Sequence, residues 1–183
     1  GQNRLESSVS VSALDAESIA DLNPSSSADL IRQIPGIRSE ASGGEGNANI
    51  AVRGIPVSTG GARYIQLQED GLPVLEFGDI VFGNADNFVR ADRNVGRVEA
   101  VRGGSASTFA SNSPGGVINF ISKTGLEEGG AVAGTIGIDH ETSRLDFDYG
   151  GALDATSYFH VGGFYRTGEG VRETGFNGKE GGQ

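Results

Sequence analysis

The sequence predicts an α+β domain with short helices and a small mixed sheet, followed by the first antiparallel strands of a large transmembrane β-barrel. Three observations support this prediction. Glycine is abundant, with 31 glycines against 5 prolines in 183 residues, which indicates turns and closely approached backbones rather than long helices. Two short helix-start signals precede a series of short strand patterns. After Gly129, three segments alternate apolar and polar residues as membrane-spanning strands do.

Two short helices are expected near the N-terminus, after a polar lead-in that can pair as a strand. Asp15 is a suitable N-cap for a helix that ends at Leu22. A second helix begins after Pro24 and stops at Pro35-Gly36. Its apolar stripe consists of Leu30, Ile31 and Ile34.

Short strands between turns are expected from Ile37 onward. Asp70-Gly71 is a hairpin turn signal. The segment Val74–Asp92 contains isolated phenylalanines among Gly, Asp and Asn residues. We expect it to form a long loop that can include a helical turn. The strand patterns are Ile50–Ile55, Arg63–Gln68, Arg97–Arg102 and Gly116–Ser122.

The three segments after Gly129 differ in how cleanly they alternate. The first places Val132, Ile136 and Ile138 on one face and Thr135 and Asp139 on the other. In the second, Leu145, Phe147 and Tyr149 oppose Arg144, Asp146 and Asp148. The third, Tyr158–Arg166, has blurred alternation and follows a short turn at Leu153–Thr156. A soluble antiparallel meander is the alternative interpretation of this alternation.

Three strands cannot close a barrel, and an open edge in lipid would leave backbone groups unpaired. The sequence also contains no methionine, even at position 1. We therefore expect this chain to be a fragment of a longer protein.

Composition argues against several other functions. The formal net charge is −10, which disfavours binding to nucleic acid through phosphate contacts. The absence of cysteine excludes disulfides and thiolate metal sites. Only His140 and His160 could supply imidazole, so we expect neither a metal site nor a cofactor. No apolar stretch is long enough for a transmembrane helix.

The catalytic signatures that the sequence suggests are incomplete. Lys123-Thr124-Gly125 matches one element of serine β-lactamases, but no serine stands three residues before a lysine. The run Gly103–Ser107 ends in serine where a nucleophile elbow needs glycine. Asp146 and Asp148 share a strand face, and a solvated or lumen-facing row is preferred over a catalytic carboxylate pair. We therefore expect no enzyme activity.

Residues from about Val9 to Gly125 resemble the plug domain of TonB-dependent outer-membrane receptors. The resemblance divides the chain into an N-terminal lead-in (1–8), a plug domain (9–125) and the start of a transmembrane β-barrel (126–183). The segments that carry it occur in the family's order: ADLIRQIPGI (28–37), IAVRGIP (50–56), IQLQEDGLPV (65–74) and VGRVEAVRGGSASTFASNSPGGVINFISKTG (95–125).

The resemblance implies roles for particular residues. The arginines of the IRG-type and VRG-type motifs, here Arg53 and Arg102, would be buried and pair with acidic groups of the barrel, with Glu99 as a member of this latch. The alternative is that both are ordinary surface arginines. Gly54, Gly103, Gly115 and Gly116 would serve close packing and positive φ angles.

The resemblance also implies where substrate would be contacted. The tips of the plug would fall at 56–63, 75–87 and 105–113. Phe109 is either a tip aromatic or a core residue. The substrate-contact candidates are Arg63, Phe77, Phe82, Phe109 and Ser111.

The implied function is TonB-dependent uptake of a scarce nutrient across the bacterial outer membrane, driven by the proton gradient of the inner membrane. The substrate would be a ferric siderophore, an oligosaccharide or another small organic molecule. The implied partners are outer-membrane lipid and the TonB energy-coupling protein, which would bind an N-terminal box upstream of this chain on the periplasmic side. A soluble β-rich adhesin or glycan-binding module is the alternative, and a hydrolase is disfavoured by the missing motifs.

Overall fold

A computed structural model of the chain describes residues 10–41, 48–55, 64–74, 89–103, 106, 110, 115–138, 141–169 and 179–180. The chain divides into two compact units. Unit 1 comprises Gly1–Ala91 with Val95–Ser122, and unit 2 comprises Asp92–Asn94 with Lys123–Gln183. No helix in the described ranges is long and apolar enough to cross a membrane.

The first helix, α1 (Ala16–Leu22), begins and ends where the sequence predicts. Its N-cap is Asp15, whose Oδ1 accepts a hydrogen bond from the Ser18 N–H at 2.9 Å. This bond satisfies one of the amide groups that have no partner within the helix. The helix stops at Asn23, which adopts a left-handed conformation with φ 44°.

The second helix, α2 (Ser27–Arg32), is shorter than predicted. The N–H groups of Gln33 and Ile34 donate to carbonyls only three residues back, so the chain tightens and leaves the α-helix before Pro35. Ile34 is still buried, at 2% exposure, although it lies beyond the helix. The apolar stripe was therefore correctly predicted, and the end of the helix was not.

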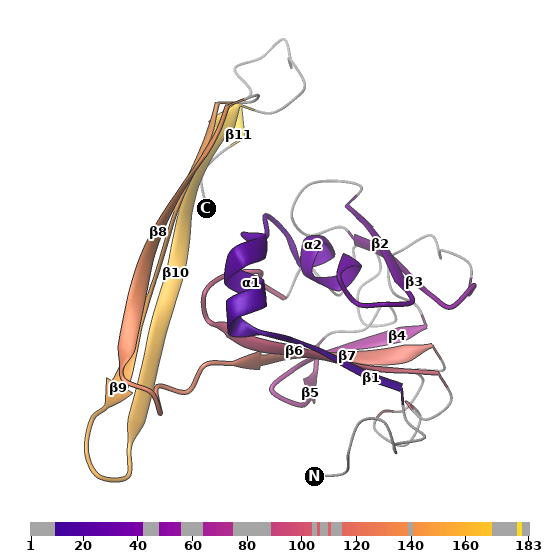
Figure 1. The fold of residues 1–183 in the computed structure, drawn as a ribbon, viewed down its shortest axis with the longest axis horizontal. Helices are drawn as coiled ribbons and strands as arrows, with labels where there is room; N and C mark the ends of the chain where they lie inside the picture. The colour runs from indigo at the N-terminus through magenta and orange to yellow at the C-terminus, as the bar shows by residue number, and fades with distance from the viewer. Residues whose placement is uncertain are drawn as a thin grey trace. The chain divides into compact units, whose positions relative to one another are not determined.

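Unit 1 contains a five-stranded mixed sheet, as predicted (Figure 1). Its order is β1 (Ser10–Asp15), β6 (Val95–Arg102), β7 (Gly116–Ser122), β4 (Ile65–Glu69) and β5 (Leu72–Pro73). β6 and β7 pair antiparallel at the centre, whereas β4 runs parallel to β7. β1 is therefore an edge strand, paired antiparallel with β6.

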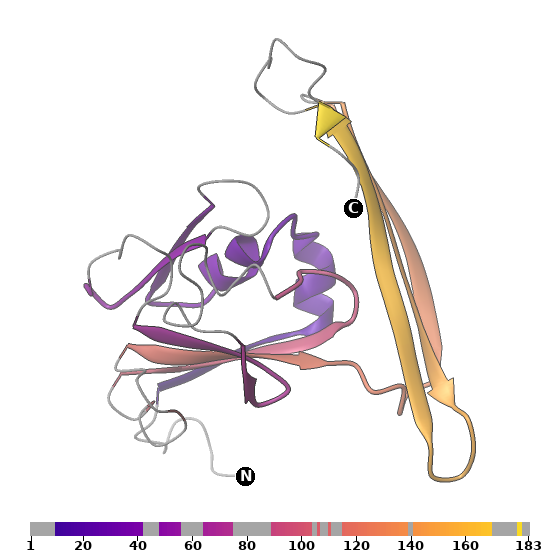
Figure 2. The ribbon, with the colours of Figure 1, turned by 180° about the vertical axis from the view of Figure 1, so that it is seen from behind.

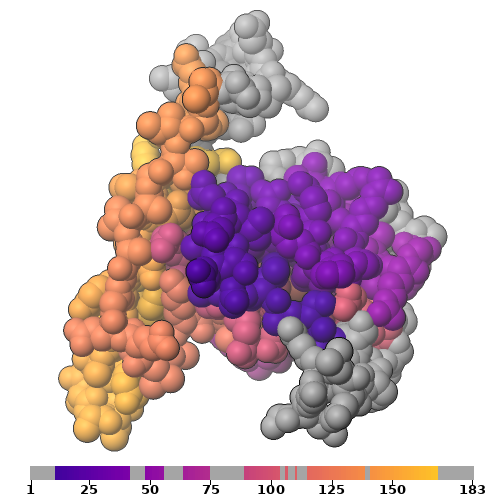
Figure 3. Space-filling view, viewed as in Figure 1, coloured from indigo at the N-terminus to yellow at the C-terminus, as the bar shows by residue number. Residues whose placement is uncertain are grey.

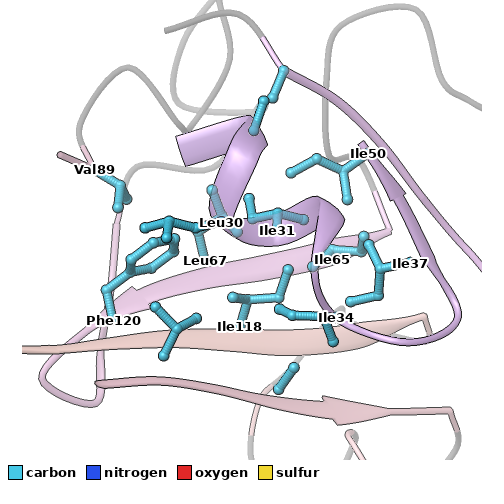
Figure 4. Close-up of a cluster of buried hydrophobic side chains, with 14 of the residues drawn as sticks. Leu30, Ile31, Ile34, Ile37, Ile50, Ile65, Leu67, Val89, Ile118 and Phe120 are labelled. Atoms are coloured by element: carbon cyan, nitrogen blue, oxygen red, sulfur yellow. The ribbon is translucent and has the colours of Figure 1, made fainter. Parts of the chain in front are cut away.

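A second layer covers one face of this sheet. It consists of α1, α2 and the hairpin of β2 (Ile37–Ala41) and β3 (Ala48–Val52), and the same arrangement is seen from behind (Figures 1 and 2). In the space-filling view these elements, coloured indigo to purple, form one continuous surface (Figure 3). Between the layers lies a core of aliphatic side chains (Figure 4), including Leu30, Ile31, Ile37, Ile50, Leu67 and Ile118.

The turn predicted at Asp70-Gly71 joins β4 to β5. Both residues have positive φ angles, 52° and 83°, which is typical of a tight hairpin turn. Asp70 also accepts a hydrogen bond from the Ser122 N–H at 2.8 Å through its Oδ1, so this turn is fastened to the end of β7.

Unit 2 is an antiparallel sheet in the order β11-β10-β9-β8. Its long strands are β8 (Gly129–Gly137), β9 (Thr142–Ala152) and β10 (Tyr158–Glu169), and β11 (Lys179–Glu180) adds a short fourth strand. The three predicted strands are thus confirmed. β10 extends beyond the predicted end at Arg166.

The long strands of unit 2 have one apolar and one polar face. On the apolar face, Val132 lies opposite Phe147, and Tyr149 opposite Val161. Val132 and Ile136 are 75% and 81% exposed, so large aliphatic side chains face outward. The register also settles the blurred third strand, which adds Phe159 and Tyr165 to the apolar face and His160 and Arg166 to the polar face.

Candidate functional site

Arg53 lies in a tight turn at the end of β3. Arg53 and Gly54 have φ angles of 47° and 80°, and the Ile55 N–H donates to the Val52 carbonyl at 3.0 Å. Two consecutive positive φ angles define a type I′ turn. A left-handed conformation costs a non-glycine residue about 1–2 kcal/mol. The strand predicted to reach Ile55 therefore stops at Val52, because the IRG-type motif is a turn.

Gly36 brings Arg53 close to Arg102. The Gly36 carbonyl accepts a hydrogen bond from the Arg53 N–H at 3.1 Å, and Gly36 itself has φ 81°. A Cβ at Gly36 would lie 3.5 Å from Arg102 Nη1 and 3.8 Å from Arg53 Cγ. A Cβ at Gly103 would lie 3.4 Å from Arg53 Nη1. The two arginine side chains therefore meet beside the turn that follows α2; we call Arg53 and Arg102 the arginine pair.

Arg102 is the last residue of β6 and is buried, at 9% exposure. Its Nη2 donates a hydrogen bond to Ser12 Oγ at 2.7 Å. Burial, and then the positive charge of Arg53, lower the pKa of Arg102 from its ordinary value. Because the guanidinium group of arginine is not deprotonated in proteins, Arg102 remains a cation at neutral pH. The alternative of an ordinary surface arginine does not fit Arg102, whereas Arg53 is exposed.

Two guanidinium groups beside one turn repel each other, and an anion between them would lower that repulsion. The planar fork of arginine is suited to bidentate contact with a carboxylate. A pocket of about 440 Å³ adjoins the Arg53 turn. Its lining residues are Gly36, Ile37, Arg38, Ala51, Arg53, Gly54 and Ile55. The arrangement is therefore chemically suited to bind an acidic group.

Glu99 is separated from the arginine pair. It forms an ion pair with Arg97, whose Nε lies 2.9 Å from Glu99 Oε1, and both side chains are about half exposed. Glu99 and Arg102 are three residues apart on β6, so their side chains leave opposite faces of the strand. The role of Glu99 in a latch stays a prediction.

Gly115 and Gly116 lie where backbone segments approach closely. A Cβ at Gly116 would be 2.7 Å from the Val101 carbonyl oxygen, and one at Gly115 would be 2.9 Å from that of Tyr64. Any larger residue would collide with these carbonyl groups. Gly54 and Gly103, in contrast, have positive φ angles.

The predicted substrate-contact residues lie outside the described residues. These are Arg63, Phe77, Phe82, Phe109 and Ser111. Most of the predicted long loop, at residues 75–88, also lies outside them.

Unit 2 contains a buried charge cluster that the sequence did not predict. Asp148 on β9 accepts from Arg93 Nε at 2.7 Å and from Lys123 Nζ at 2.8 Å, and His160 Nε2 lies 3.3 Å from it. The Asp148 side chain is only 5% exposed. A solvated row therefore does not fit Asp148, because cations from distant segments cover this carboxylate, and a lumen-facing row stays a prediction.

Asp146 is likewise buried and paired. Arg144 forms two hydrogen bonds with it, Nε to Oδ2 at 2.9 Å and Nη2 to Oδ1 at 2.8 Å. The Arg144 guanidinium carbon also lies 4.2 Å from the centre of the Phe164 ring. Asp146 and Asp148 share a strand face as predicted, but each binds different cations.

Comparison with known proteins identifies the family. The family model described as TonB-dependent Receptor Plug Domain matches residues 3–117. This match covers more than half of the chain and includes both members of the arginine pair. The chain belongs to this family. Unit 1 is therefore referred to as the plug.

Curated relatives are similar over most of this chain. The ferric enterobactin receptor of Pseudomonas aeruginosa is 27% identical over 184 residues, covering 88% of this chain and 24% of that protein. The vitamin B12 transporter BtuB of Photobacterium profundum is 30% identical over 124 residues, covering 67% of this chain and 19% of that protein. The chain thus spans about a quarter or less of the length of these relatives.

Solved structures share the fold. The ferric yersiniabactin uptake receptor of Yersinia pestis superimposes with a TM-score of 0.65 at 24% identity, over 87% of this chain and 24% of that one. A mutant of the Pseudomonas aeruginosa ferric enterobactin receptor in complex with enterobactin gives a TM-score of 0.62 at 26% identity, over 86% and 24%. The predicted fold class, a plug followed by antiparallel strands that do not close a barrel within this chain, is confirmed.

Several residues of these sites had no recognisable signal in the sequence. Ser12 and Arg93 belong to no motif that we could interpret. Gly36 and Lys123 lie in the segments that resemble the family, but nothing in the sequence indicated their contacts with Arg102 and Asp148. Their importance depends on contacts between residues far apart in the chain.

Proposed function

We propose that this chain is the plug and the first barrel strands of a bacterial outer-membrane receptor that takes up a small nutrient in a TonB-dependent manner. The match of residues 3–117 to the plug family carries this proposal. Uptake of this kind needs no covalent chemistry. The protein acts by binding its substrate and by remodelling the plug.

The sheet of unit 2 supports a location in the membrane. Its apolar face exposes large side chains on three adjacent strands: Val132, Ile136, Leu145, Phe147, Tyr149, Val161 and Tyr165. Its polar face buries Asp146 and Asp148 in ion pairs. Lipid on one face and a polar interior on the other is the pattern of transmembrane β-barrels.

The N-terminus supports coupling to TonB from the periplasm. β1 is the first described element, and it lies at an edge of the plug sheet. We propose that a box upstream of this chain pairs with TonB by strand addition. Tension on that segment would reach β1 before any other described element.

The arginine pair supports a latch between the plug and the barrel. Arg102 is buried and cationic, and Arg53 lies beside it at the edge of a pocket. We propose that a barrel carboxylate binds both guanidinium groups, and that Glu99, on the opposite face of β6, contributes to the latch without touching the arginine pair. Holding the pair would keep the plug in its closed conformation.

The substrate class rests on the relatives. Two of them are described as a ferric enterobactin receptor and a vitamin B12 transporter. We propose a scarce small molecule of comparable kind, such as a ferric siderophore, with oligosaccharides as a further class. Contact would be made by the tip segments that contain Arg63, Phe77, Phe82, Phe109 and Ser111.

The experiment is to express the full-length receptor and fractionate the cells. We expect it in the outer membrane, with an SDS-resistant form that is lost on heating. A deletion strain should then lose energised uptake of one class among ferric siderophores, cobalamin and oligosaccharides. A freely soluble full-length protein would contradict the proposal and favour the adhesin.

A further inference from the structure

The edge strand β1 contacts the arginine pair through one side chain. β1 pairs with β6 from Ser10 opposite Arg102 to Asp15 opposite Arg97. Ser12 stands opposite Ala100, two residues from Arg102 on the same face of β6. A diagonal neighbour of this kind is within reach of a long side chain. The Arg102 Nη2 donates to Ser12 Oγ at 2.7 Å.

This hydrogen bond fixes the Nη2 atom of the Arg102 guanidinium group. The second terminal nitrogen, Nη1, lies beside Gly36. Nη1 is 3.5 Å from the position that a Gly36 Cβ would take. Arg102 is thus held between β1 on one side and the Gly36–Arg53 turn on the other. Its 9% exposure depends on the elements packed around it, and β1 is one of them.

We propose that Ser12 is a positioning residue that couples the N-terminal strand to the arginine pair. This inference rests on the proposed TonB-dependent function and on the latch. While β1 is paired with β6, Ser12 holds the Arg102 guanidinium in the geometry that binds a barrel carboxylate. When β1 is drawn away from β6, the hydrogen bond is lost and the latch opens.

The physical reason lies in the flexibility of arginine. Its long side chain loses considerable rotamer freedom when it is fixed in one geometry. A charge-assisted hydrogen bond offsets part of that loss. Because β1 is at the sheet edge, β6 is the one strand of this sheet with which it pairs. The central β6–β7 pairing and the parallel β7–β4 pairing do not involve β1, so its departure would break the β1–β6 ladder, the contact of Leu14 with the core and the hydrogen bond from Arg102 to Ser12.

The first test measures passive influx of a large hydrophilic antibiotic through the full-length receptor in cells without TonB. S12A should raise influx about tenfold, the factor expected for one lost hydrogen bond to a charged group. S12T keeps the hydroxyl group and should therefore show the wild-type rate of influx. V11A, on the same strand but the opposite face, is the control and should leave influx unchanged.

The double variant S12A/R102A separates coupling from ordinary strand stability. If Ser12 acts through Arg102, the double variant should leak no more than R102A alone. Additive effects, or a wild-type rate in S12A, would overturn the coupling. If R102A itself does not leak, the latch fails, which is a distinct result from failure of the coupling.

A second test leaves both Ser12 and Arg102 intact. Val11 and Val101 are directly opposed in the β1–β6 ladder, and opposed Cα atoms in antiparallel pairs are about 4.5–5.5 Å apart, within disulfide range. A V11C/V101C receptor should lose energised uptake when oxidised and regain it on reduction, because β1 can no longer leave β6. Uptake that continues in the oxidised receptor would overturn the proposal.

Discussion

Lys123 and Asp148 form an ion pair, with Lys123 Nζ 2.8 Å from Asp148 Oδ2. Arg93 binds the other oxygen of the same carboxylate, at 2.7 Å. The Lys123 N–H also donates to the Asn94 carbonyl at 2.8 Å. Arg93, Lys123 and Asp148 all belong to unit 2, so one carboxylate on β9 binds two segments of this unit that are far apart in the chain.

Asp148→Asn should weaken this attachment. Asparagine keeps the shape but not the charge, so two cations lose their ion-pair partner. Because Arg93 and Lys123 are partly exposed, we expect the free energy of unfolding to fall by about 1–3 kcal/mol. The measurement is the temperature at which the full-length receptor loses its SDS-resistant form. Asp21→Asn, at an exposed position on α1, should leave that temperature unchanged. Equal temperatures for both variants would contradict a stabilising role for the cluster.

Replacing both members of the arginine pair should open the latch. In the full-length receptor, R53A/R102A should raise passive antibiotic influx by at least about tenfold, since losing one side of a buried ion pair costs about 3–5 kcal/mol. R32A is the control, because Arg32 is exposed, pairs with Asp29 on the same helix and does not line the pocket beside Arg53. Normal influx together with normal uptake in the double variant would rule out the latch.

Gly116→Ala should destabilise the plug. The new methyl group would lie 2.7 Å from the Val101 carbonyl oxygen, so β6 and β7 would have to separate. Overpacking of this kind costs about 1–3 kcal/mol. Gly134→Ala is the matched control, because no atom lies within 4 Å of its Cβ position. Faster amide exchange in β6 and β7 should appear for the first variant only.

Asp15 should make the stability of α1 depend on pH. Hydrogen bonds from Ser18 lower the pKa of Asp15 in the folded chain. The stability that ionised Asp15 contributes to α1 is therefore complete above the ordinary aspartate pKa, near 3.9. This stability is lost as the pH falls through the lowered pKa of Asp15 in the folded chain. Amide exchange in α1 should be faster in Asp15→Ala than in the wild type at neutral pH. The difference should disappear in acid, and a difference independent of pH would contradict the capping role.

Arg144→Lys should not be conservative. Lysine cannot form the two parallel bonds to Asp146, nor place a flat cation over the Phe164 ring. We expect the free energy of unfolding to fall by about 1–2 kcal/mol. The measurement is the temperature at which the SDS-resistant form disappears, which should be lower in the variant. Arg38→Lys, at an exposed ion pair, should have no measurable effect.

Local signals in the sequence determined much of the secondary structure. The Asp15 cap, the Asp70-Gly71 turn and the period-2 alternation of β9 depend on neighbours within a few residues, so they could be recognised without the fold. The order of four plug segments also predicted the family. The end of α2 and the turn at Arg53 were missed, because a tightened last turn and a left-handed arginine leave little trace in hydrophobic patterning.

Only the tertiary structure decided which distant residues meet. The parallel pairing of β4 with β7 and the edge position of β1 follow from packing of the whole sheet. Ser12 and Arg102 are 90 residues apart, and Arg93 and Asp148 are 55 apart. A charged side chain carries no sequence signal for its partner, because pairing depends on burial and register across strands. Asp148 was therefore predicted only to lie in a solvated or lumen-facing row, and the structure buries it among cations.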